Sequence, residues 1–294
     1  MARKRLNIAI IGFGEAGAAI ASGLQRPNIT AYDVKLDDAT NSMAQQIVAC
    51  DASTANNIAD LMIGADVVFS VVTADQAFEA AQAAALHIET GALFFDCNSC
   101  APSTKVRSAS VINDAGGRYV DVAIMAPIHP RAHKTPMLVA SSAAEDAIAC
   151  MTNLGMDATL VGKTVGRAST IKMLRSVMVK GIEALTAECF RAACRAGVAQ
   201  DVAASLDASQ SQLGWADQTA YNLERMTTHG LRRAAEMREV TKTLQDLGVA
   251  SEMTNGTVNW QQSMGDLNIL LDDVGGLHDR MATIEESDSN QNGN

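Results

Sequence analysis

Residues 6–17 read Leu6-Asn7-Ile8-Ala9-Ile10-Ile11-Gly12-Phe13-Gly14-Glu15-Ala16-Gly17. The apolar first half is typical of a buried parallel strand, and the small residues that follow, Ala18 to Ala21, suit a helix. Between them lies Gly-x-Gly-x-x-Gly. Its first glycine permits a tight turn, its second lets the backbone approach a pyrophosphate, and its third lets helix and strand pack closely. The helix N-terminus offers free N–H groups to the phosphates. The pattern predicts a dinucleotide loop, the alternative being a glycine-rich turn without a ligand; the loop residues are Gly12, Phe13, Gly14, Glu15, Ala16 and Gly17.

An acidic residue follows at the distance that such a loop requires. The second expected strand, Ile29–Asp33, ends in Asp33, about twenty residues further on, where a carboxylate can accept hydrogen bonds from the adenosine ribose. A carboxylate would repel a 2′-phosphate, so the sequence favours NAD over NADP. Lys35 lies close enough to weaken that preference, which leaves NADP open.

The overall composition restricts the partners and the compartment. The chain has 294 residues and a formal net charge of −10, so nucleic acid and anionic membranes are poor partners. No apolar stretch is long enough to span a bilayer. Six cysteines without a disulfide-framework pattern favour a reducing cytoplasm. Cys97 and Cys100 fit C-x-x-C, but they follow an expected strand and no second pair follows, so we interpret the spacing as coincidence and predict no metal.

Strand and helix patterns alternate over the first 165 residues, which predicts a Rossmann domain with a doubly wound, mostly parallel sheet. The expected strands are Leu6–Ile11, Ile29–Asp33, a short one near Val48, Val67–Val72, Leu93–Asp96, Tyr119–Val122, Met137–Ala140 and Thr159–Val161. The expected helices are Glu15–Leu24, Ala74–His87, Pro102–Ala115 and Ala143–Met151.

The pattern after residue 165 is helical throughout, which predicts an all-helical substrate and dimerisation domain over residues 166–285. Gly230 and Gly248 are expected to separate its segments. The acidic, polar residues 286–294 predict a disordered tail. A helix as long as 169–196 cannot be covered by so few neighbours, so we predict a homodimer that buries its exposed face. The expected helices are 169–196, Asp201–Ser211, Trp215–Thr227, Leu231–Leu247 and Met253–Met264.

Polar residues follow the fourth and fifth expected strands. In a doubly wound sheet, ligands lie over the carboxyl ends of the strands, so Val72, Thr73 and Asn98 are candidates for cofactor contacts. Asn98 and Ser99 are candidates for substrate contacts by the same argument. Each polar residue could equally be a helix cap or a turn residue.

Lys172 is the candidate for acid/base chemistry. It stands early on the long helix among apolar neighbours, and burial can lower the pKa of a lysine enough for proton transfer near neutrality; the alternative is a solvated helix lysine. Arg175 and Ser176 lie three and four residues on and share its helix face. The basic segment His129–Lys134 is either an anion-binding loop or a solvated loop.

Three segments together resemble the β-hydroxyacid dehydrogenase superfamily, which includes 3-hydroxyisobutyrate and 6-phosphogluconate dehydrogenases. Gly12–Gly17 matches the cofactor loop, Asp96–Pro102 looks like the Asp-x-Ser-Ser/Thr-x-x-Pro segment, and Gly166–Lys172 falls on the Gly-x-Gly-x-x-x-Lys segment. The family's lysine is its catalytic acid/base, which implies that role for Lys172. The helical half is similar to a less characterised branch with a phosphogluconate-dehydrogenase-like C-terminal domain.

The chain departs from the family at the substrate segment. The family's Asp-Ala-Pro-Val-Ser-Gly-Gly is replaced by Asp121-Val122-Ala123-Ile124-Met125-Ala126-Pro127, so the Ser-Gly-Gly cradle is missing and Met125 stands at the substrate site. An anionic substrate group would instead be held by Arg175 or by the His129–Lys134 loop.

The sequence therefore predicts an NAD(P)-dependent dehydrogenase that acts on a β-hydroxyacid or a related polar alcohol. Lys172 is its expected acid/base, and Asn98, Ser99, Met125, Arg175 and Ser176 are expected to bind the substrate. One alternative is imine reduction, although those relatives commonly carry another residue at the lysine position. The other is a cofactor-binding regulatory protein without turnover.

Overall fold

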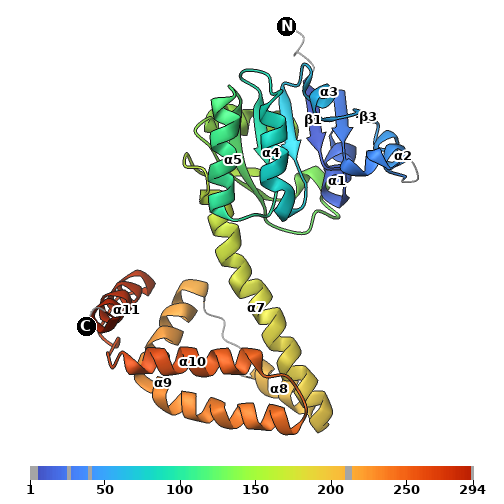
Figure 1. The fold of residues 1–294 in the computed structure, drawn as a ribbon. Helices are drawn as coiled ribbons and strands as arrows, with labels where there is room; N and C mark the ends of the chain where they lie inside the picture. The colour runs from blue at the N-terminus through green and yellow to red at the C-terminus, as the bar shows by residue number, and fades with distance from the viewer. Residues whose placement is uncertain (1–5, 25–27, 39–41, 209–213, 293–294) are drawn as a thin grey trace. The chain divides into compact units, whose positions relative to one another are not determined.

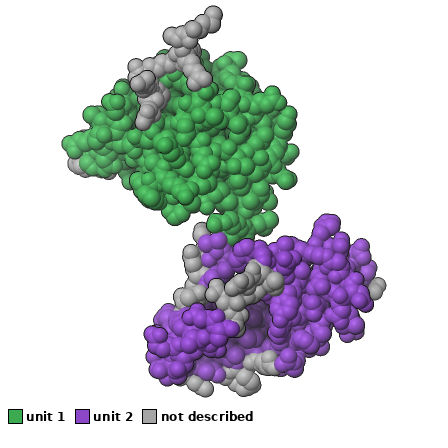
Figure 2. All heavy atoms as spheres, turned by 180° about the vertical axis from the view of Figure 1, so that it is seen from behind, with its two compact units in different colours: residues 1–177 green, residues 178–294 purple. Residues whose placement is uncertain are grey.

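The computed structural model describes residues 6–24, 28–38, 42–208 and 214–292. It divides into two compact units, residues 1–177 and residues 178–294, which Figure 2 shows in separate colours. The long helix α7 (Arg167–Ala196) contributes residues to both units.

The first unit is built on one eight-stranded sheet in the order β3-β2-β1-β4-β5-β6-β7-β8. All neighbouring strands pair in parallel except β6 and β7, which are antiparallel. The apolar runs become fully buried central strands, as expected of a parallel sheet covered on both faces. The strands are β1 (Asn7–Ile11), β2 (Asn28–Tyr32), β3 (Ser53–Thr54), β4 (Val67–Ser70), β5 (Leu93–Asp96), β6 (Arg118–Ile124), β7 (Met137–Ala140) and β8 (Ala158–Gly162).

Helices cover both faces of this sheet (Figure 1). One face packs against α1 (Glu15–Gly23), α2 (Met43–Ala49) and α6 (Ala144–Asn153). The other packs against α3 (Ile58–Met62), α4 (Ala77–Ala85) and α5 (Pro102–Asp114). Short 3₁₀ turns complete the unit: Val34–Asp37, Ala74–Gln76 and Ala132–Lys134.

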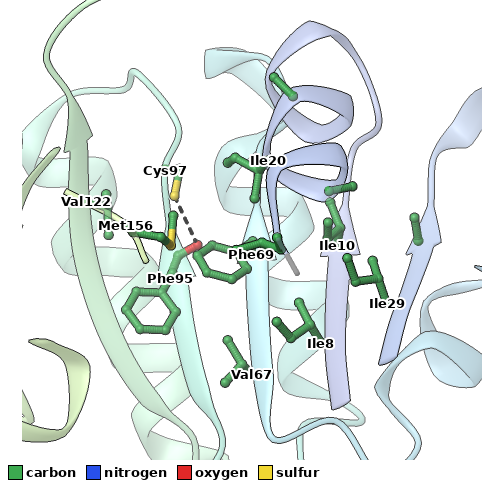
Figure 3. Close-up of a cluster of buried hydrophobic side chains, with 14 of the residues drawn as sticks. Ile8, Ile10, Ile20, Ile29, Val67, Phe69, Phe95, Cys97, Val122 and Met156 are labelled. Atoms are coloured by element: carbon green, nitrogen blue, oxygen red, sulfur yellow. Dashed lines mark hydrogen bonds between the residues drawn. The ribbon is translucent and has the colours of Figure 1, made fainter. Parts of the chain in front are cut away.

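Two aromatic side chains from neighbouring central strands lie in the hydrophobic core on the first face of the sheet. Phe69 of β4 and Phe95 of β5 stack with their ring centroids 5.0 Å apart, beside Ile8 and Ile10 of β1 (Figure 3). Cys97 lies in the same cluster and its thiol contacts the Phe95 carbonyl oxygen at 3.8 Å. Such interlocking side chains fix the relative height of the strands, and therefore the edge where their carboxyl ends meet.

The second unit is helical, and its helices are α8 (Ala199–Ala208), α9 (Trp215–Asp246), α10 (Glu252–Asp266) and α11 (Leu277–Asn292), with the later part of α7. Buried Glu188 of α7 accepts hydrogen bonds from the Met253 and Thr254 N–H groups, both at 2.9 Å, at the first turn of α10. A carboxylate at a helix N-terminus is favourable because it meets unpaired donors and the positive end of the dipole.

Three expectations about individual elements differ from the structure. Val48 lies in helix α2, and the third strand is the two-residue segment Ser53–Thr54. Gly230 does not interrupt α9, because it lies against Gly265 of α10, where the absence of a side chain lets the two helices touch. The tail prediction is wrong for residues 286–292, which continue α11. That helix is anchored upstream by Ile284 in an apolar cluster and by Arg280, which ion-pairs with Glu224 at 3.1 Å.

The division between the units also differs from the predicted boundary at residues 165 and 166. The first turns of α7 belong to the sheet unit because Ala168 is buried against Ala123 and Ala140. Residues 209–211 of the expected helix 201–211, and residues 293 and 294 of the expected tail, lie outside the described residues. Among the described helices, none has a segment that is both long and apolar enough to cross a lipid bilayer.

Candidate functional site

The glycine loop lies at the carboxyl end of β1, where the expected helix α1 begins at Glu15. Gly12 adopts a φ of +87° and donates its N–H to the Tyr32 carbonyl at 2.8 Å. A Cβ at Gly12 would lie 2.8 Å from the Val71 carbonyl oxygen, and a Cβ at Gly17 would collide with the Gly12 carbonyl oxygen. These two glycines therefore serve the close approach of β1, α1 and the segment after β4.

Gly14 has a different environment. A Cβ built there would find no heavy atom within 4 Å, and Gly14 immediately precedes the first turn of α1. Open space above unpaired helix N–H groups is the arrangement that a pyrophosphate requires. Glu15 is exposed and Ala16 half-buried beside it, so the chain's own loop residues fit a dinucleotide.

Asp33 follows β2 and supports the loop directly. Its Oδ2 accepts the Phe13 N–H at 2.7 Å, and its Oδ1 accepts the Lys35 N–H at 3.0 Å. Buried Phe13 thereby orients its backbone toward the neighbouring strand end. Each carboxylate oxygen has a second lone pair, so these bonds leave Asp33 able to accept from a ribose hydroxyl.

Asn98 connects the ends of β4 and β5. Its Oδ1 accepts the Val72 N–H at 2.7 Å, and its Nδ2 donates to Ser70 Oγ at 2.9 Å. The Asn98 side chain is buried, so most of its hydrogen-bonding capacity is used to hold the two segments together. Thr73 is exposed at the same edge, directly after Val72, and precedes the turn Ala74–Gln76.

The structure brings Lys172 and Ser99 together, although they are far apart in sequence. Lys172 Nζ donates to Ser99 Oγ at 2.6 Å, which places the ammonium group of α7 over the segment after β5. Ser176 donates its hydroxyl to the Lys172 carbonyl at 2.9 Å, and Arg175 is exposed one turn along the helix. Met125, directly after β6, packs partly buried against the cluster that contains Ala168 of α7.

A buried charge cluster below this pair was not identified from the sequence. Asp96, the last residue of β5, and Asp121, in the middle of β6, are register partners, and both are fully buried. Lys105 of α5, also fully buried, donates to Asp96 Oδ1 at 2.9 Å and lies 3.7 Å from Asp121 Oδ1. Two acids within neighbouring apolar strands were the available signal, but a lysine within an amphipathic helix normally points to solvent.

Tyr119 of β6 completes the cluster and donates its hydroxyl to Asp96 Oδ2 at 2.6 Å. Burial and then the Asp96 carboxylate raise the pKa of Tyr119, so the phenol remains a donor. Burial works against the charged form of Lys105, but the Asp96 and Asp121 carboxylates outweigh it and raise the pKa of this ammonium above its usual value. Lys105 therefore stays protonated across the neutral range.

The structure does not bring the basic loop to this site. His133 lies against Gly23 in the last turn of α1, whereas the glycine loop precedes the first turn of the same helix. Burial, with a smaller contribution from Lys134, lowers the pKa of His133. His133 is therefore a neutral, half-buried side chain that packs against α1.

The cysteines and possible metal ligands add no further centre to the part of the chain that the structure describes. Cys97 and Cys100 are buried free thiols, and burial raises the pKa of Cys97 to about 12, which disfavours the reactive thiolate. In the described ranges, no three His, Cys, Asp or Glu side chains are grouped so that they could hold a metal ion.

Comparison with known proteins places these features in a family. Residues 7–162 match the NAD binding domain of 6-phosphogluconate dehydrogenase, and residues 193–264 match a domain of unknown function. An NAD-dependent L-serine dehydrogenase from Pseudomonas aeruginosa is 30% identical over 121 residues, which is 40% of each chain.

Solved structures are similar over nearly the whole length. A conserved hypothetical protein from Sinorhizobium meliloti is 33% identical, with 97% of each chain covered and a TM-score of 0.61. A conserved protein described as structurally similar to 3-hydroxyacid dehydrogenases is 27% identical, with 89% of this chain and 97% of that chain covered and a TM-score of 0.59. An imine reductase from Streptomyces aurantiacus shares the fold, with 16% identity, 95% and 99% coverage and a TM-score of 0.72.

Proposed function

The chain belongs to the family of the NAD binding domain of 6-phosphogluconate dehydrogenase, within a superfamily of NAD(P)-dependent oxidoreductases, and from this membership we propose a specific activity. The protein is a dehydrogenase that oxidises a β-hydroxyacid or a related polar alcohol, with Lys172 as the general acid/base. The observation that carries the proposal is the 2.6 Å contact between Lys172 Nζ and Ser99 Oγ at the carboxyl edge of the sheet. That edge is where ligands of doubly wound sheets bind.

The proposed chemistry divides between the cofactor and the chain. Bound NAD⁺ or NADP⁺ would supply the hydride acceptor. The loop Gly12–Gly17, Asp33, Val72 and Thr73 would hold and orient it. The neutral amine of Lys172 would take the proton of the substrate hydroxyl, and the protonated amine would return it in the reverse reaction. Ser99, which already accepts a hydrogen bond from Lys172 Nζ, would orient the hydroxyl at that atom.

The chain offers two candidates around this proton-transfer position for selecting the substrate. Arg175 is exposed one turn after Lys172 and would bind an anionic substrate group, whereas His133 packs away from the site. Met125 would present a thioether where relatives carry a backbone cradle, and Ser176 and the remaining Asn98 amide proton would add polar contacts. These features support a substrate with one anionic and one less polar end.

The cofactor preference follows from Asp33. Its carboxylate supports NAD, because a 2′-phosphate would be repelled. Titration of the protein with NADH and NADPH, followed by fluorescence, tests this preference. Tighter binding of NADPH would contradict it and would indicate that exposed Lys35 outweighs Asp33.

The test of the activity measures NADH formation over a panel of β-hydroxyacids, including serine, sugar acids and their phosphates. Lys172→Ala is expected to lower kcat roughly 10²–10⁴-fold while NADH binding stays near the wild-type value, because only the proton transfer is removed. Lys163→Ala is the matched control. That lysine is exposed, and its ion pair with Glu145, at 3.8 Å, joins two exposed side chains. Wild-type turnover in Lys172→Ala would refute the assigned role.

Two other functions are outcomes of the same experiment. Lysine-independent reduction of cyclic imines, with no alcohol oxidised, would favour an imine reductase with the same fold. NADH binding without turnover of any substrate would favour a regulatory cofactor-binding protein.

We also propose a homodimer in which a second copy covers α7. Apolar side chains recur on it at helical spacing and are more than one third exposed: Ile171, Leu174, Met178, Ile182 and Leu185. A continuous apolar helix face of this length is costly in water, and self-association through a two-fold axis is the simplest way to bury it.

A further inference from the structure

The buried cluster under Lys172 has an imbalance of charge. Asp96 and Asp121 contribute two carboxylates and Lys105 one ammonium, and all three side chains are fully buried. One negative charge is therefore not neutralised by the lysine. Such a charge is strongly unfavourable in the interior unless other donors or dipoles stabilise it.

The first turn of α7 supplies these donors. Asp121 Oδ2 accepts hydrogen bonds from the Gly166 N–H at 3.0 Å, from the Ser169 N–H at 3.2 Å and from the Ser169 hydroxyl at 3.2 Å. The two N–H groups belong to the start of the helix, where backbone donors lack intrahelical acceptors and the macrodipole is positive. The excess carboxylate charge therefore holds the start of α7 against β6.

The other end of the cluster holds the partner of Lys172. Asp96 Oδ1 accepts the Asn98 N–H at 3.0 Å, which fixes the segment that carries Ser99. Lys105 Nζ also donates to the Asp96 carbonyl at 2.6 Å and so restrains the end of β5. Both partners of the 2.6 Å contact between Lys172 and Ser99 are thus attached to the same three buried charges.

We infer that Asp96, Lys105 and Asp121 are positioning residues that set the separation of Lys172 Nζ from the reacting hydroxyl. The effect of these residues on catalysis rests on the proposed function, whereas their effect on the position of Lys172 does not. Lys172 lies three residues after Ser169, so a shift of the first turn moves its Nζ. Misplacement of a reacting group by about 1 Å can lower a rate roughly 100-fold.

The experiment compares three variants. Asp121→Asn removes the charge, and Ser169→Ala removes one donor to Asp121 and is the milder change if Asp121→Asn fails to fold. Thr170→Ala is the matched control, because both hydroxyls donate to the Gly166 carbonyl, at 3.0 Å from Ser169 and 2.7 Å from Thr170, but only Ser169 also contacts Asp121. Hydrogen exchange over residues 164–173 and the rate of Lys172 acetylation are measured without any substrate.

Asp121→Asn is expected to speed exchange in this segment about tenfold or more, and Ser169→Ala to a smaller extent, each beyond Thr170→Ala. The rate of Lys172 acetylation is expected to differ from the wild-type rate most in Asp121→Asn, less in Ser169→Ala and least in Thr170→Ala. On the oxidation of whichever substrate the panel identifies, Ser169→Ala should lower kcat with KM nearly unchanged.

Exchange and acetylation equal to those of Thr170→Ala in both variants would overturn the inference. Faster hydrogen exchange, if the Lys172 acetylation rate and kcat both stayed at their wild-type values, would also overturn the inference. If no alcohol is oxidised, the proposed function fails alone, because exchange and acetylation still decide whether the cluster positions Lys172. If Lys172→Ala is inactive but Ser169→Ala keeps wild-type kcat, the proposed function stands and the positioning role fails.

Discussion

At Gly17 an added methyl group would meet the Gly12 carbonyl oxygen, whereas at Gly14 it would find nothing within 4 Å. We therefore expect Gly17→Ala to lower the free energy of unfolding by about 1–3 kcal/mol, through overpacking. Gly14→Ala should leave stability near the wild-type value, because its φ of −72° suits alanine, and should weaken NADH binding by occupying the phosphate space. Thermal denaturation and NADH titration of both variants measure this. Normal NADH affinity in Gly14→Ala would contradict a phosphate site there.

His133 supplies a pH dependence at the residue scale. Its Nδ1 is buried without a hydrogen-bond partner among the described residues, and burial and then Lys134 lower its pKa. Because the folded pKa lies below the unfolded one, the unfolded state takes up the proton first as the pH falls. Stability from this group is therefore complete above the unfolded pKa and decreases as the pH falls toward the folded pKa.

Denaturant unfolding between about pH 7 and about pH 5 tests this. His133→Gln should lose less stability than the wild type over that interval. His87→Gln, which removes an exposed histidine from the same unit, should behave like the wild type. Equal acid sensitivity of wild type and His133→Gln would show that this histidine contributes nothing to it.

How much of the site could be predicted depends on whether the reason for a residue is local. The glycine spacing and Asp33 could be identified because a turn and a strand end impose them within one βαβ unit. The paired acids Asp96 and Asp121 could not, because their burial depends on Lys105 arriving from a helix. The contact between Lys172 and Ser99 was not predicted: the sequence assigned each residue to the substrate site separately, and no local pattern relates residues that far apart.

At the scale of elements, α9 and α10 pack through two glycines. A Cβ at Gly230 would collide with the Gln261 carbonyl oxygen and lie 2.8 Å from the Gly265 N atom, while a Cβ at Gly256 on α10 meets nothing within 4 Å. We expect Gly230→Ala to lower the free energy of unfolding by about 1–3 kcal/mol. Gly256→Ala, the matched control, should raise it by about 0.5–1 kcal/mol through helix propensity. Urea unfolding measures both, and a stabilised Gly230→Ala would show that the helices can separate without cost.

The same glycine explains why element boundaries were harder to predict than element types. The confirmed fold class rests on long apolar periodicities, which exist before any tertiary contact forms. A glycine within a helical pattern reads as an interruption from sequence, but Gly230 is required by a neighbour that arrives later in the chain. The strand Ser53–Thr54 could not be predicted from the sequence either, because two exposed polar residues form a strand only by pairing with β2.

At the scale of the whole molecule, the proposed homodimer makes a prediction about α7. Ile182 is 46% exposed on its apolar face, and a stable interface needs roughly 800 Å² from each partner, so a buried charge there should be decisive. We expect the wild type to sediment with the mass of two chains and Ile182→Glu with the mass of one. Ile63→Glu is the matched control, because this isoleucine is 77% exposed and directly follows α3 in the sheet unit. It should remain a dimer, which would exclude a general effect of the added charge. Two results would mean that a second copy does not cover this face: a wild type that sediments with the mass of one chain at micromolar concentration, or an Ile182→Glu variant that sediments with the mass of two.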